Sequence, residues 1–282
     1  MPSYDSARSR FRLAEDHLAL LIHMMSGEPL PAGYGAAAAE LQHSGLVSET
    51  GEISVQLVPL LETLAAPEVA ISAEVIGQQG VLNHGLAVGE TYVFSHEEWP
   101  GQREVEYAQV EPKLLVWSLA FLVNLRQADA LDVAVPYIET SIGTMDVGLA
   151  ALDGPADDDA PERIQRALTE VGDLTEPALS LFSHLLTELR AHWRLTSAWH
   201  GRDGGQLTVG VRGFGIWDCG PLGYWHRESP SEPVHEGQVG PDSPLVLRPV
   251  NSKRIWDMMT DLLPGENEVR GPQSNGTGAV RD

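Results

Sequence analysis

The sequence predicts an α/β protein of the α+β type, in which two quasi-symmetric antiparallel sheets carry flanking helices. Three observations support this class. The hydrophobic period changes from that of helices to that of strands twice along the chain. A helix, about four strands and a further helix occur in the same order in each half, and short segments of the two halves align. The 282 residues are 43% hydrophobic, which suffices for a sizeable core.

The first half is predicted to begin with three helices. Apolar residues at helical spacing predict the first over 13–26, and an alanine-rich run predicts the second over 36–41. The third, over 55–65, is expected to end before Pro67. Alternation of apolar and small or polar residues then predicts four strands, followed by a strongly apolar helix, with bounds 69–75, 81–86, 91–95, 104–110 and 114–125.

The second half repeats this order. A helix is expected over 177–189, and the strands and closing helix that follow are expected over 193–199, 207–211, 223–228, 245–250 and 253–263. The segment 60–66 aligns without gaps on 185–191, which is typical of a duplication. We therefore predict a first α/β repeat, a helical and acidic linker region, a second α/β repeat and a disordered tail, at 1–126, 127–175, 176–264 and 265–282.

The charge balance excludes two classes of partner. Lys and Arg number 18 against 40 Asp and Glu, so the formal net charge is −22. Such a chain repels nucleic acid and anionic membrane surfaces, which both require basic side chains. The longest apolar run, of about 12 residues, is shorter than the roughly 20 that span a bilayer. The single cysteine, Cys219, allows no intramolecular disulfide and favours a reducing cytosol.

Motifs of catalysis and cofactor binding are missing from the sequence. It contains no phosphate-binding loop, nucleophile elbow or paired zinc-binding histidines. Cys219 could act as a nucleophile only if a histidine such as His192, His200 or His226 served as its base, and Asp218 beside it disfavours the thiolate. We therefore expect no enzyme activity, no cofactor and no metal.

Two segments resemble the EspG proteins associated with ESX (type VII) secretion in actinobacteria. In the first, the small-residue helix, turns and closing helix of that family match Gly45-Leu46, Gly51, Leu61, Leu64 and Pro67. In the second, the family's acidic hairpin, strand and final helix match Asp218, Gly220, Gly223-Tyr224, Val246, Pro249 and Leu262-Leu263. The hairpin departs from the family at Cys219 to Leu222, which lengthen the turn.

The resemblance implies a quasi-two-fold α/β fold and a cytosolic chaperone without catalysis. Such a protein would bind PE–PPE-type or WXG-type helical pairs and keep their apolar tip soluble. Aromatic side chains near predicted strand ends are the candidate partner contacts: Tyr92, Phe94, Trp99, Trp217, Tyr224 and Trp225. The main alternative is a winged-helix-like regulator, with residues 13–66 as its helices and the strand from Val69 as its wing. An enzyme with a site of histidines and carboxylates is the third.

Overall fold

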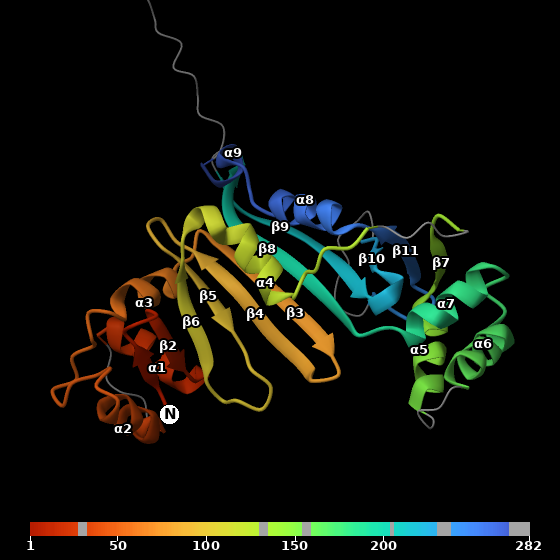
Figure 1. Ribbon diagram of the computed structural model, residues 1–282. Helices are drawn as coiled ribbons and strands as arrows, with labels where there is room; N and C mark the ends of the chain where they lie inside the picture. Colours follow the sequence, from red (N-terminus) through yellow and green to blue (C-terminus); the bar gives the residue numbers. More distant parts are fainter. Residues whose placement is uncertain (28–32, 130–134, 154–158, 204–205, 230–237, 271–282) are drawn as a thin grey trace, which may run out of the picture.

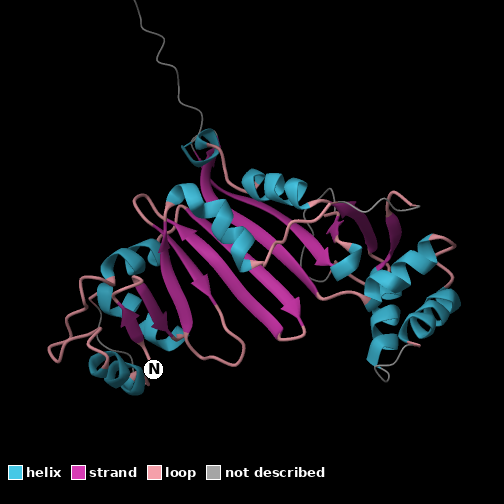
Figure 2. Ribbon diagram, in the orientation of Figure 1, coloured by secondary structure: helices cyan, strands magenta, loops and turns pink. Residues whose placement is uncertain are grey.

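Eleven antiparallel strands form one sheet in the computed structural model, which describes the chain except for residues 28–32, 130–134, 154–158, 204–205, 230–237 and 271–282 (Figures 1 and 2). The spatial order is β1-β2-β6-β5-β4-β3-β8-β9-β10-β11-β7. The strands are β1 (Ser3–Asp5), β2 (Arg10–Leu13), β3 (Val69–Gly77), β4 (Gly80–Val88), β5 (Val93–Glu97), β6 (Val105–Val110), β7 (Ile138–Ser141), β8 (Ala191–Asp203), β9 (Gln206–Asp218), β10 (Tyr224–Arg227) and β11 (Pro244–Val250). The predicted α/β class with antiparallel strands and flanking helices is confirmed.

The two predicted sheets are joined edge to edge. Strand β3 pairs with β8 along its whole length, from Val69 opposite Trp199 to Gly77 opposite Ala191. An unpaired sheet edge exposes a row of backbone N–H and C=O groups, and this pairing satisfies both edges at once. The outcome is one continuous sheet with β3 and β8 at its middle.

Nine helices accompany the sheet in the described part of the chain. They are α1 (Glu15–Met25), α2 (Gly35–His43), α3 (Val58–Ala65), α4 (Leu115–Leu122), α5 (Ile142–Ala150), α6 (Ala160–Val171), α7 (Ala178–Thr187), α8 (Ser252–Asp261) and α9 (Glu266–Arg270). None of them is long and apolar enough to cross a membrane.

Several elements differ from the sequence prediction. The sequence does not predict strands β1, β2 and β7, and β7 lies with helices α5 and α6 in the region expected to be a helical and acidic linker. Residues 266–270 of the predicted disordered tail form α9, which contacts β8, whereas 271–282 lie outside the described residues. The domain boundaries themselves stay a prediction.

Helices α4 and α8 lie together across one face of the middle strands (Figure 1). Their inward side chains, which include Leu119 and Met259, pack on alternate residues of β3 and β8 such as Ile71 and Leu195. This layer is the central core of the molecule.

The other helices lie on the opposite face, at the two ends of the sheet. Helices α1 to α3 pack on β2, β5 and β6 through a core that contains Phe11, Phe94 and Tyr107. Helices α5 to α7 pack on β7, β9, β10 and β11 through a core that contains Trp217 and Trp225. Among the described residues, no helix packs on this face of β3 and β8, and β4 and β9 are covered on it only near one end each.

The winged-helix alternative is wrong. The strand that begins at Val69 would have to be a peripheral wing, but it is paired on both sides at the centre of the sheet. The helices α1 to α3 pack on the sheet through their apolar faces and form no separate unit.

Candidate protein-binding face

The helices leave one face of the middle strands partly open. Directly opposed residues of antiparallel strands share one face, so the pairing registers define what lies there. The exposed residues on this face belong to β4, β3, β8 and β9 and are Val81, Asn83, Ala70, Ser72, Glu74, Arg194, His200, Val209, Val211 and Gly213. We define these residues as the uncovered face.

Small residues form the floor of the uncovered face. Ala70 and Ala198 form one row across β3 and β8, and Ser72, Thr196 and Gly213 form the neighbouring row across β3, β8 and β9. A Cβ atom on Gly213 would lie 2.9 Å from the backbone oxygen of Leu195, so a larger residue there would disturb β8. A floor of this kind allows another backbone to approach closely.

Exposed apolar side chains border the floor. Val209 and Val211 of β9 are 65% and 61% exposed, and Val81 of β4 is 54% exposed. Four strands span about 15–20 Å at about 4.8 Å each. Two packed helices, about 10 Å in diameter and 8–10 Å apart, have about the same width. The dimensions therefore match the end of a helical pair.

Most of the six aromatic residues predicted as partner contacts are buried in the core. Phe94, Trp217, Tyr224 and Trp225 are buried, at 3%, 4%, 5% and 0% exposure. Tyr92 is half-buried beside Phe94. These side chains lie in the cores beneath the helices and do not form one surface, because aromatic residues in alternating strands are also the largest contributors to burial.

Trp99 is the exposed member of the set. It lies after β5, in the turn before β6, and is 45% exposed. Trp99 and Tyr92 are thus the members of the predicted set with accessible surface, and partner contact by any of the six stays a prediction. The uncovered face itself was missed, because alanine, serine and threonine carry no chemical signal in a sequence and the strand registers alone bring them together.

A second apolar surface lies on the outer side of α4. Leu114, Trp117 and Phe121 are 48%, 64% and 70% exposed, and Trp117 makes an edge contact with Trp256 of α8 at 4.6 Å between ring centroids. This surface faces away from the uncovered face and is a competing site for a protein partner.

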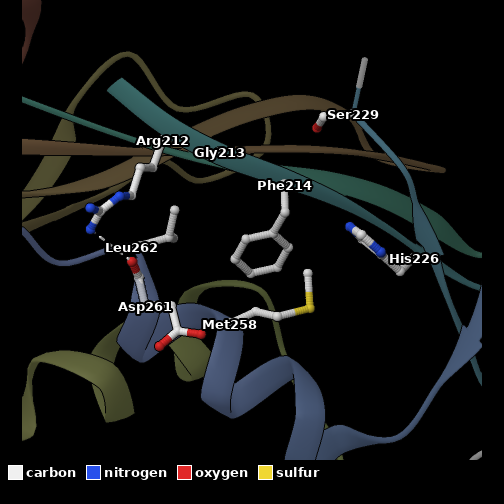
Figure 3. Close-up of a pocket in the computed structure, with 8 residues that line it drawn as sticks. All are labelled: Arg212, Gly213, Phe214, His226, Ser229, Met258, Asp261 and Leu262. Carbon is white, nitrogen blue, oxygen red and sulfur yellow. Dashed lines mark hydrogen bonds between the residues drawn. The ribbon is translucent and has the colours of Figure 1, made fainter. Parts of the chain in front are cut away.

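A hollow of about 390 Å³ lies between β9 and α8 (Figure 3). It is lined by Arg212, Phe214, His226 and Met258 among others, and Asp261 lies at its edge. Burial lowers the pKa of His226, so the ring is neutral near pH 7. Arg212 is engaged by the carbonyl oxygens of Asp261 and Leu263 at 3.2 Å.

The histidines considered as bases are divided between the two faces. His226 borders the hollow, whereas His192 and His200 point from β8 to the opposite side of the sheet. Cys219 is buried, and burial together with the charge of Asp218 raises the pKa of its thiol far above the usual value. Among the described residues, no histidine forms a hydrogen bond with Cys219. They also include no group of three His, Cys, Asp or Glu residues arranged to hold a metal.

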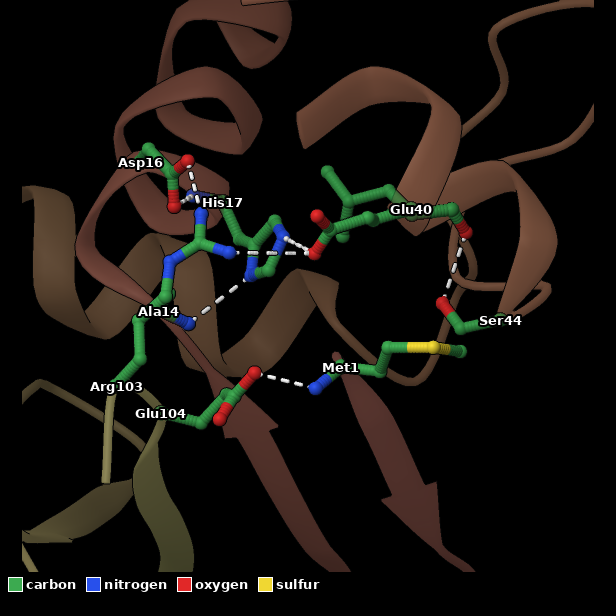
Figure 4. Close-up of polar contacts among 9 residues, drawn as sticks. Met1, Ala14, Asp16, His17, Glu40, Ser44, Arg103 and Glu104 are labelled. Carbon is green, nitrogen blue, oxygen red and sulfur yellow. Dashed lines mark hydrogen bonds and ion pairs between the residues drawn. The ribbon is translucent and has the colours of Figure 1, made fainter. Parts of the chain in front are cut away.

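A polar network fixes the N-terminal helices (Figure 4). The buried His17 accepts a hydrogen bond at Nδ1 from the Ala14 N–H and bonds Glu40 through Nε2, each at 3.0 Å. Arg103, from the turn before β6, pairs with Asp16 and with Glu40 at 3.5 Å. The histidine is thus a structural hydrogen-bonding residue that links α1 to α2.

Comparison with solved structures finds the same fold in a protein of Mycobacterium tuberculosis. It is the type VII secretion system chaperone EspG5, solved in complex with the PE25–PPE41 dimer. The match has a TM-score of 0.54 and 12% sequence identity, and it covers 90% of this chain and 97% of that chain. No protein-family model and no curated protein sequence matches the chain.

Proposed function

We propose that this protein is a cytosolic, non-enzymatic chaperone associated with type VII secretion, which binds PE–PPE-type helical pairs and keeps them soluble. The observation that carries the proposal is the uncovered face, a floor of small residues between two groups of helices in a fold shared with EspG5. That neighbour was solved with a PE–PPE dimer bound.

The physical chemistry of the uncovered face supports this role. Its small residues allow a helix to lie close to the sheet, and Val209 and Val211 supply exposed apolar area. The net charge of −22 elsewhere would keep a complex with an apolar cargo tip in solution.

The test is binding of purified PE–PPE-type pairs from the source organism, measured by calorimetry with two matched variants. Ala70→Arg places a long charged side chain on the floor, and Trp117→Arg places the same side chain on the outer surface of α4. Both positions are exposed, so both variants should fold.

We expect Ala70→Arg to weaken binding at least tenfold and Trp117→Arg to leave it within twofold. The reverse pattern would assign binding to α4. If the unmodified protein binds no PE–PPE-type or WXG-type pair, the proposed function is wrong.

A further inference from the structure

Two arginines flank a glycine in one row across the uncovered side of the sheet. Arg194 of β8 is opposite Gly215 of β9, and Gly215 is opposite Arg227 of β10. On the far side of Arg194 the row continues to Glu74 of β3. All four residues share one face, because directly opposed residues of antiparallel strands point to the same side.

The glycine leaves a gap between the two arginines. A Cβ atom built on Gly215 would lie 3.9 Å from the Cβ atom of Arg227 and 3.8 Å from the backbone oxygen of Trp193. Those are the two nearest atoms, so no side chain of the described residues occupies that position. With strands about 4.8 Å apart, the two arginine backbones are about 10 Å apart. Two guanidinium groups at that spacing can converge on one oxyanion placed over the glycine.

The two guanidinium groups have no partner among the residues that the structure describes. In the part of the chain that the structure describes, neither Arg194 nor Arg227 forms an ion pair or a side-chain hydrogen bond, with Glu74 or with any other residue. Burial and the charge of Arg194 both lower the pKa of Arg227. Two unneutralised cations side by side, one of them partly buried, would be stabilised by an anion.

We propose that Arg194 and Arg227 form a notch over Gly215 that binds a carboxylate side chain of the protein that docks on the uncovered face. The inference deepens the proposed function and rests on it. The notch adjoins the row of Ser72, Thr196 and Gly213, so a helix on that floor would present an Asp or Glu to it.

Charge complementarity selects this occupant. The chain carries 40 acidic residues against 18 basic ones, so its overall field repels a nucleic acid or an anionic lipid surface. Glu74 lies in the same row, and its negative charge would repel a ligand that carries several negative charges, such as a phosphate. A single carboxylate meets both arginines with the least repulsion, and Arg is the side chain best suited to bidentate recognition of it.

The experiment measures the affinity of the same PE–PPE-type pairs for four variants of the full chain at low and high salt. The variants are Arg194→Ala, Arg227→Ala, the double variant, and Glu74→Gln. Arg254→Ala is the matched control, since Arg254 is exposed on α8 at the opposite face of the sheet. Thermal unfolding of each variant checks that it folds.

We expect each single arginine variant to bind about tenfold more weakly and the double variant to lose most of its salt dependence. Glu74→Gln should bind about twofold more tightly, and the control should stay within twofold. If the unmodified protein binds the pair and the folded double variant binds it equally well, the notch is refuted while the proposed function stands. If the unmodified protein binds no pair, both fail together.

Discussion

Substitution of Trp225 and Trp99 separates a core role from a contact role among the predicted aromatic residues. Trp225 is fully buried and donates a hydrogen bond from Nε1 to the Leu222 carbonyl oxygen at 3.0 Å. Trp225→Ala removes that bond and a large apolar side chain, which typically costs about 3–5 kcal/mol of unfolding free energy. In a chain of 282 residues each kcal/mol corresponds to about 2 °C, so Tm should fall by about 6–10 °C.

A milder change at the same position keeps the comparison interpretable. Trp225→Phe retains an aromatic ring but leaves the Leu222 carbonyl without its partner, and it should cost about 1–2 kcal/mol, or about 2–4 °C in Tm. Trp99 is 45% exposed, so Trp99→Ala should change the unfolding free energy by less than about 0.5 kcal/mol. If Trp99 is a partner contact, that variant should weaken binding by about tenfold.

Thermal unfolding followed by circular dichroism gives Tm, and calorimetry well below Tm gives the affinity for a PE–PPE-type pair. We expect substitution of Trp225 to lower Tm without weakening binding, and substitution of Trp99 to weaken binding without lowering Tm. Weaker binding by Trp225→Phe at unchanged Tm would show that this indole contacts the partner and that the core assignment is wrong.

Two further predictions concern buried polar groups. His17→Phe leaves the buried Ala14 N–H without a partner and leaves Glu40 paired only with Arg103, so it should lower the unfolding free energy measured in urea by about 2 kcal/mol, whereas His43→Phe on the exposed side of α2 should change it little. Because burial raises the pKa of Cys219, its thiolate is scarce below pH 9, so a thiol reagent at pH 8 should modify it only as the protein unfolds; immediate modification of the folded protein would contradict the buried position.

The periodic elements of the fold are predictable from the sequence. The alternation of Val69, Ile71 and Ala73 predicts β3, because one face of that strand packs on α4 and α8. Strand β2 is four residues long, and two of them are arginines that pair with Glu106 of β6, so it shows no hydrophobic run. A strand held by long-range pairing leaves little local signal.

The candidate site is less predictable for a related reason. Aromatic side chains are candidate partner contacts in a sequence. Phe94 and Trp217, however, are buried in the core because they are large and apolar. The floor consists of small residues such as Ala70 and Ser72, which form a continuous surface only when β3 and β8 pair. The notch likewise requires Arg194, some twenty residues before Gly215, to lie beside it through the β8–β9 register.

The pairing of β3 with β8 also explains why the uncovered face exists. The two halves follow a similar order: outer strands (β1 and β2 in the first half, β7 in the second), three helices, four strands and a helix, after which the second half adds α9. In each half the three helices follow the outer strand, β2 or β7, and pack at that end of the sheet. The inner strands are left bare on that face, and one half alone would expose only about two of them. Joining the halves through their inner strands places the bare strands side by side and about doubles the width of the floor. A break of the β3–β8 pairing would therefore remove the uncovered face even if both halves kept their own cores.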